Sequence, residues 1–109
     1  YKKRILESHP EVDFARLNGS VLTSRKKEEP GLSERKSILS EYLEEKNLSG
    51  MYDKAKALKC NQDDLIDAIC LAVSGAMHAH GQCETIPENP ERDENGLLMQ
   101  LTVPLKRSR

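Results

Sequence analysis

The chain carries two strand-like segments at opposite ends of its sequence, with helical patterns between them. Residues 3–7 (KRILE) are moderately patterned for a strand, and residues 97–103 alternate apolar and polar side chains up to Pro104. Two strands alone cannot make a satisfactory sheet core, because an isolated strand pair is marginally stable in water. We therefore expect a fragment of a larger α/β domain. The alternative is a chain that completes its sheet with a second copy.

Four helices are predicted between these strands from apolar spacing and end signals. The first has the expected order of proline at its start and glycine after its end. Ser33 and Asn61 are predicted N-caps, because short polar side chains favour that position. The expected ranges are 10–19, 33–46, 51–58 after a break at Ser49–Gly50, and 61–81, followed by a polar loop through Asn95–Gly96.

Composition indicates one small soluble domain. The 109 residues are 37% hydrophobic and 32% charged, which suits a single partial domain over residues 1–109. No apolar run reaches the roughly 18 residues of a membrane span, and the N-terminal residues do not form a signal peptide. The three cysteines are widely spaced without a CxxC pair, which favours reduced thiols. We therefore expect no membrane partner and a cytoplasmic location.

Any contact with nucleic acid would have to be local. The net charge of -1 at pH 7 gives no general attraction to phosphates. The chain has no Trp and is only 4% aromatic, which argues against stacking platforms for single strands. The basic run that contains Lys26 and Lys27 is one candidate for phosphate contact, although a solvated loop explains it equally well.

The segment from Leu65 to Ala79 is apolar or small almost throughout, and Asp67 is its only acid. A helix of this composition is expected inside a core. A buried carboxylate there needs a cation or several donors. Asp64 lies three residues earlier and projects from the same side of the helix. Two such oxygen ligands are typical of Mg²⁺ or Mn²⁺ sites, although capping explains Asp64 equally well and a buried ion pair remains an alternative for Asp67.

A further acid, Glu7, ends the first strand candidate. In extended geometry Glu7 and His9 point to the same face, and Pro10 then turns the chain into a helix. The carboxyl end of a strand directly before a helix is where α/β folds place their ligands. The alternative is an exposed glutamate at a strand end, which is common.

These residues resemble a known family. ESHPEVDFARLNG (7–19) is similar to the E-x-HPE-x-x-F-x-x-L-x-G block of domain of unknown function 429, a family of predicted RNase-H-like nucleases. The resemblance continues through the segment at Ser24 to Lys27, the Gly31…Arg35…Ile38-Leu39 pattern, the DDLIDA helix at 63–68, and the Ile86-Pro87-Glu88 loop. Leu98 and Gln100 depart from the expected Pro and Glu.

The resemblance implies an α/β fragment of an RNase-H-like fold, mostly helical with about two short strands. It implies that Glu7, Asp64 and Asp67 are catalytic and metal ligands, with His9, Lys26 and Lys27 in supporting positions. The expected reaction is cleavage of a nucleic-acid phosphodiester by water activated at two Mg²⁺ or Mn²⁺ ions. The family's opening Gly-Ile-Asp-Gly strand is not found in this sequence. We therefore expect the chain by itself to be inactive unless a missing N-terminal segment or a second copy completes the sheet.

The alternative is a non-catalytic module whose acids are structural and whose helices serve protein contacts. His78, His80 and Cys83 form a further polar group, but their spacing matches no standard zinc site. Asp64→Asn and Asp67→Asn substitutions would separate the two hypotheses, because only the nuclease hypothesis predicts that these acids bind metal.

Overall fold

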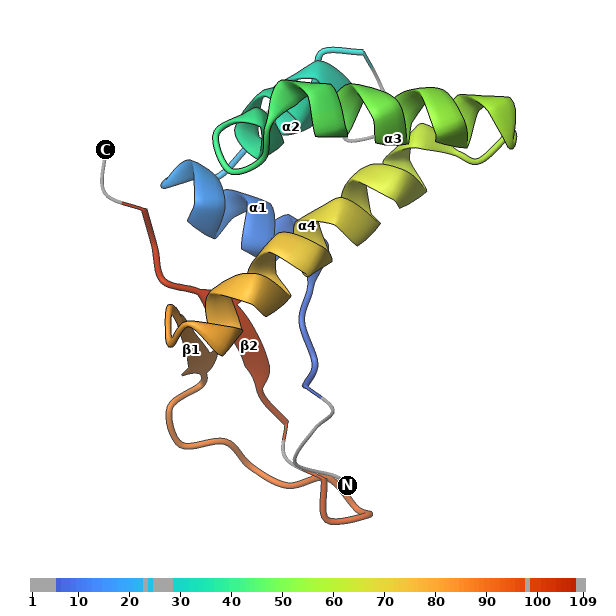
Figure 1. Ribbon diagram of the computed structural model, residues 1–109. Coiled ribbons are helices and arrows are strands. Elements are labelled where there is room, and N and C mark those ends of the chain that lie inside the picture. Colours follow the sequence, from blue (N-terminus) through green and yellow to red (C-terminus); the bar gives the residue numbers. More distant parts are fainter. Residues whose placement is uncertain (1–5, 23, 25–28, 98, 108–109) are drawn as a thin grey trace.

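The computed structural model describes residues 6–22, 24, 29–97 and 99–107, and in this part of the chain helices come first and a small sheet last (Figure 1). The mixed, mostly helical α/β class predicted from the sequence is confirmed at this level. The elements are α1 (Pro10–Asn18), α2 (Gly31–Ser40), α3 (Glu45–Ala57), α4 (Gln62–Ala79), β1 (Cys83–Ile86) and β2 (Leu101–Pro104).

Helix α1 has the predicted ends. Pro10 occupies its first turn, where backbone N–H groups have no partner within the helix, so the N–H that proline lacks costs no hydrogen bond. Gly19 follows the helix in the left-handed conformation, with φ 85°, which glycine adopts without the steric penalty of a side chain. Phe14 and Leu17 are fully buried and share one face of the helix, as predicted.

The second and third predicted helices have different boundaries in the structure. Helix α2 begins at Gly31, so Ser33 is not its N-cap, and it ends at Ser40 rather than near Lys46. The Tyr42 hydroxyl donates a hydrogen bond of 2.8 Å to the Leu17 carbonyl, which ties the turn after α2 to the end of α1. Helix α3 then runs through Ser49 and Gly50 without a break. A single helix-interior glycine costs only about 1 kcal/mol, which the packing of Leu48 and Ala55 offsets.

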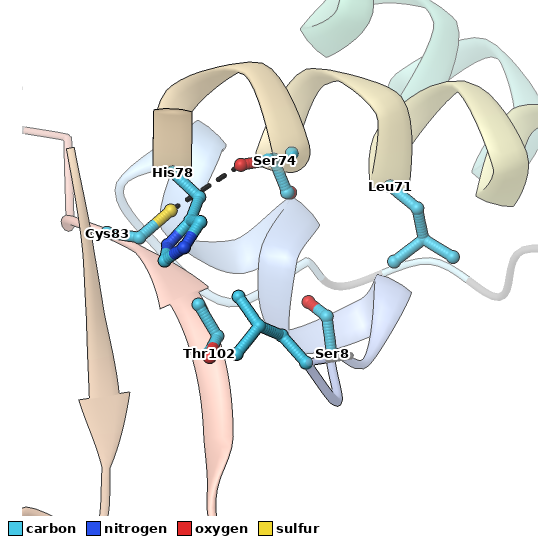
Figure 2. Close-up of a pocket in the computed structure, with 8 residues that line it drawn as sticks. Ser8, Leu71, Ser74, His78, Cys83 and Thr102 are labelled. Carbon is cyan, nitrogen blue, oxygen red and sulfur yellow. Dashed lines mark hydrogen bonds between the residues drawn. The ribbon is translucent and has the colours of Figure 1, made fainter. Parts of the chain in front are cut away.

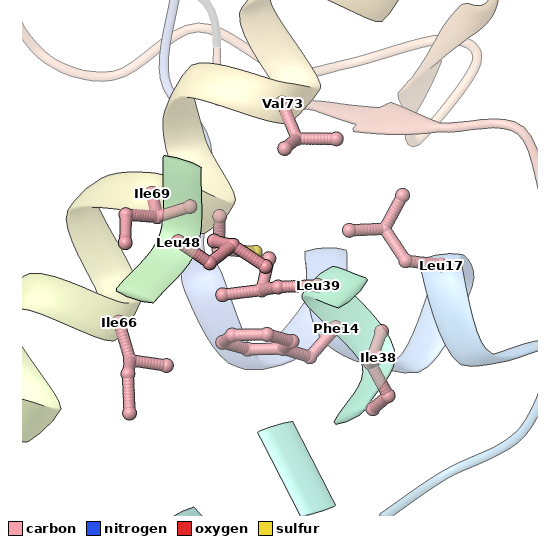
Figure 3. Close-up of a cluster of buried hydrophobic side chains, with 9 residues drawn as sticks. Phe14, Leu17, Ile38, Leu39, Leu48, Ile66, Ile69 and Val73 are labelled. Carbon is pink, nitrogen blue, oxygen red and sulfur yellow. The ribbon is translucent and has the colours of Figure 1, made fainter. Parts of the chain in front are cut away.

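Helix α4 is the longest element and crosses the other helices (Figure 1). It begins after Asn61 and ends at Ala79, close to the predicted Gly81. One face of α4 contributes Ile66, Ile69, Cys70 and Val73 to the core. Figure 3 shows Ile66, Ile69 and Val73 in one cluster with side chains from α1, α2 and α3. The buried cluster comprises Phe14, Leu17, Ile38, Leu39, Leu48, Ile66, Ile69, Cys70 and Val73.

The described residues cover the opposite face of α4 only in part. Leu71 and Gly75 are exposed, together with Ala68, Ala72 and Ala76. The prediction that this whole segment lies inside a core is therefore wrong for its outer face in this structure. No helix in the described residues combines the length and the apolar character required to cross a bilayer.

The sheet consists of β1 paired antiparallel with β2, with Glu84 opposite Val103 and Thr85 opposite Thr102. Strand β1 (CETI) was not predicted, because its short and polar sequence has no alternating pattern. The predicted strand at residues 97–103 is shorter in the structure and begins at Leu101. Of the predicted strand at 3–7, only Leu6 and Glu7 are described, and they are not part of a strand. The Glu7 carbonyl nevertheless accepts a 2.8 Å hydrogen bond from Thr102 N–H, so this segment lies beside β2.

A buried arginine joins α1 and α2. The Arg35 side chain is 2% exposed and pairs with the Glu11 carboxylate through Nε, at 3.1 Å, and Nη2. Its other donors reach the carbonyls of Gly31, at 3.0 Å, and Ser24, at 3.1 Å. The guanidinium also lies 5.9 Å from the centre of the Phe14 ring. Each of the three guanidinium nitrogens therefore donates at least one hydrogen bond, which offsets the cost of burying the charge.

We expect Arg35→Ala to lower the free energy of unfolding by about 3 kcal/mol, because Glu11 and two carbonyls lose their donors and a cavity remains. Urea denaturation of the purified variant measures this. Arg92→Ala is the matched control, since Arg92 is exposed and its guanidinium donates to the Gly96 carbonyl within its own loop; its effect should stay within about 0.5 kcal/mol. Equal effects of the two substitutions would contradict the assigned role of Arg35.

Candidate functional site

The two predicted acids of α4 differ in their surroundings. Asp64 is exposed in the first turn, and its Oδ2 accepts a long hydrogen bond of 3.5 Å from the Asn61 side-chain nitrogen, whereas the Asn61 side chain makes no capping bond to the backbone. Asp67 is half-buried, and its Oδ1 is shielded from solvent. Asp67 is therefore the acid whose position at the edge of the core agrees with the sequence analysis.

Several carboxyl groups lie near Cys70, where α4 crosses the start of α1. Burial raises the pKa of the Cys70 thiol strongly, and the charges of Asp13, Asp67 and Glu11 raise that pKa further. The Cys70 thiol lies 3.7 Å from the Pro10 carbonyl oxygen. Negative charge from both helices therefore acts on this crossing point, and Cys70 itself is an unreactive core thiol.

The remaining predicted residues lie on the surface or outside the described part. Glu7 and His9 are exposed. His9 has extended backbone angles and precedes α1 directly. Lys26 and Lys27 lie outside the described residues, so the structure says nothing about their predicted supporting role.

Carboxylate oxygens are suitable donors for Mg²⁺ or Mn²⁺, but a cation site needs several of them together. Within residues 6–22, 24, 29–97 and 99–107, no three His, Cys, Asp or Glu side chains are grouped closely enough to hold a metal ion. Glu7, Asp64 and Asp67 thus have the oxygen ligands that these metals prefer. Among the described residues, however, too few such ligands lie together to hold the ion. The described residues alone support no hydrolytic step through a bound metal.

An acid that the sequence analysis missed is the most deeply buried polar group near this crossing. Asp13 is fully buried in α1. Its Oδ2 accepts hydrogen bonds from the hydroxyls of Ser8, at 2.6 Å, and Ser74, at 2.9 Å. Its Oδ1 has no hydrogen-bond partner among the described residues. One carboxyl group therefore joins the segment before α1 to α4.

The sequence contains a signal for this burial. Asp13 is next to Phe14 and four residues before Leu17, so it lies on or beside the face that these apolar residues bury. An acid at such a position in an amphipathic helix predicts either a buried polar network or an ion pair.

A pocket of about 270 Å³ opens beside this network (Figure 2). Its wall comes from the segment before α1, from α4 and from both strands. The Cys83 thiol lies 3.5 Å from the Ser74 carbonyl oxygen, and burial together with the Asp13 charge raises the pKa of Cys83. The lining residues are Leu6, Ser8, Leu71, Ser74, Gly75, His78, Cys83 and Thr102.

Comparison with known families identifies the wider group. The model of the family described as "Protein of unknown function (DUF429)" matches residues 1–92. The chain belongs to this family. No curated protein and no solved structure shows significant similarity to it. The family assignment predicted from the ESHPE and DDLIDA motifs is therefore confirmed, and its description assigns no activity.

We expect the buried carboxyl of Asp13 to make stability depend on pH. Burial raises its pKa above the ordinary 3.8, although the Ser8 and Ser74 hydroxyls and the His9 charge oppose this. The folded chain thus holds the proton more tightly than the unfolded chain. The folding stability that this tighter proton binding contributes is fully present below pH 3.8, and it is lost as the pH rises through the raised pKa.

Replacement of Asp13 by Asn should remove this contribution, because the amide oxygen accepts the same hydroxyl protons without charge. Urea denaturation between acid and neutral pH should show the variant gaining stability relative to the natural chain as pH rises. Asp53→Asn, at an exposed position of α3, is the matched control and should give no such trend. If the free energies of unfolding of Asp13→Asn and the natural chain differ by the same amount at every pH, Asp13 does not titrate in this pH range.

Proposed function

We propose that this chain is the acid-bearing, mostly helical part of a metal-dependent nuclease of the RNase-H-like class, which hydrolyses phosphodiester bonds of nucleic acid. Glu7, Asp64 and Asp67 are its proposed ligands for Mg²⁺ or Mn²⁺. Further acids must come from another segment or polypeptide, because the described residues bring together too few.

The observation that carries the proposal is the face that α4 turns toward the start of α1. Asp67, Cys70 and Ser74 are spaced by three and four residues, so they share this face. Cys70 meets the Pro10 carbonyl, and Ser74 donates to Asp13. The helix with the predicted acids is thus held against the residues that directly follow Glu7. Family membership supports the proposal, since the matched range includes both acid-bearing segments.

The proposed partner is a polypeptide that completes the sheet. Strand β2 already has the Leu6–Ser8 segment beside it through the bond between Thr102 N–H and the Glu7 carbonyl. The added strands would come from a preceding N-terminal segment of the domain or from a second copy. A sheet of more than two strands would also bury apolar surface that β1 and β2 cannot cover alone.

A non-catalytic interaction module is the second candidate function. It is favoured by the exposed outer face of α4, where Leu71 is 38% exposed. In that case the acids are structural, and divalent metal has no effect on the chain.

We expect Mn²⁺ to bind the chain weakly and Asp67→Asn to reduce the affinity on the order of ten-fold, as removal of a ligand or its support does. Isothermal titration calorimetry or electron paramagnetic resonance of Mn²⁺ measures this. Asp63→Asn is the matched control, because it removes the same charge from the first turn of the same helix. Equal losses of Mn²⁺ affinity in both variants would indicate that only the total negative charge of the helix matters, and would count against a site at Asp67.

We expect the purified chain to cleave neither DNA nor RNA, because the acids it brings together are too few for two-metal hydrolysis. A fluorescent oligonucleotide assay with Mg²⁺ or Mn²⁺ tests this. Cleavage that requires Mn²⁺ and disappears in Asp67→Asn would show instead that the chain holds a complete site.

A further inference from the structure

The pocket beside α4 has an apolar mouth. Leu6 and Leu71 line it and are 47% and 38% exposed. Large apolar side chains at the rim of a hollow leave surface that an apolar ligand would cover. The volume of about 270 Å³ exceeds the roughly 150 Å³ of a cavity that holds benzene. The space therefore suits a ring system larger than benzene.

The inner wall of the pocket presents hydrogen-bond acceptors. The hydroxyl protons of Ser8 and Ser74 are directed to Asp13 Oδ2. The Cys83 S–H is directed to the Ser74 carbonyl, as the dashed line in Figure 2 shows. A hydroxyl that has donated its proton still has lone pairs to offer. The Ser8 and Ser74 oxygens therefore favour a ligand group that donates a hydrogen bond.

Gly75 marks the same hollow. It lies inside α4, where glycine is less favourable than alanine by roughly 0.5–1 kcal/mol. A Cβ built at this position would meet nothing within 4 Å. No described neighbour therefore requires the glycine, which is exposed and is one of the residues that line the pocket.

We propose that this pocket binds a flat, largely apolar ring system of indole size, which donates a hydrogen bond from its edge to the Ser8 and Ser74 oxygens. The rim leucines cover the faces of the ring, and the buried Asp13 orients the two hydroxyls. None of the proposed metal ligands lines this pocket, although Leu6 and Ser8 flank Glu7 in the sequence, and the ring-binding proposal does not depend on the nuclease proposal.

The experiment is an NMR titration of the full chain with indole and with 1-methylindole, which lacks the N–H. Indole should shift the amide signals of Ser8, Leu71, Ser74, Gly75 and His78, with a roughly millimolar dissociation constant. Loss of one hydrogen bond should make 1-methylindole bind about five-fold more weakly. Ser74→Ala should bring the affinities for indole and 1-methylindole closer together, because it removes one of the two proposed acceptors.

Substitution of Gly75 by Leu fills the pocket and should abolish binding without unfolding the chain, since the position is open. Gly50→Leu is the matched control: Gly50 is also inside a helix with nothing within 4 Å of its Cβ, and it lies in α3, away from the pocket. It should bind indole normally.

Binding that persists in Gly75→Leu, or the absence of shifts up to the solubility limit of indole, would overturn the proposal. Equal affinities for the two probes would overturn the assignment of a donor. Shifts at the same residues that grow with protein concentration alone would identify a second copy as the occupant and would also overturn it.

Discussion

The buried carboxyl of Asp13 is the constraint on which the arrangement around the pocket depends. Its Oδ2 accepts one hydroxyl from the segment before α1 and one from α4. These bonds hold the chain after Glu7 against the helix that carries Asp67. Both hydroxyl protons point to the carboxyl, so the hydroxyl oxygens of the pocket wall remain as hydrogen-bond acceptors. A buried group with an unsatisfied oxygen is costly, so the rest of the core must offset it.

That core depends on the inner face of α4 and on the buried Arg35. The guanidinium satisfies Glu11 and two carbonyls at once, which fixes α2 on α1. Phe14 and Leu17 then pack against α4. The outer face of α4 remains exposed and consists of Leu71 and uncharged small residues, Ala68, Ala72, Gly75 and Ala76. An apolar helix covered on one side is typical of a domain to which another layer is added.

The proposed metal site and the proposed ring-binding pocket use different parts of α4, whereas Glu7 lies between Leu6 and Ser8 of the pocket wall. Asp64 and Asp67 are at the beginning of α4, whereas Ser74, Gly75 and His78 line the pocket in its second half. The family match covers the acid-bearing segments and assigns a role neither to the acids nor to the pocket. The crossing at Cys70 separates the two regions and gathers negative charge, which favours cations near Asp67 and opposes a thiolate at Cys70.

The sequence alone determined the helical ends at Pro10, Gly19 and Asn61, the face of Phe14 and Leu17, and the family, because these depend on local backbone preferences and on ordered motifs. Tertiary structure decided where α2 ends, since Tyr42 bonds Leu17, and that Gly50 lies within a helix. It also decided that β1 pairs with β2, because strand pairing needs a distant partner. The burial of Asp13 likewise follows from contacts between distant segments, whose packing energies local spacing does not encode.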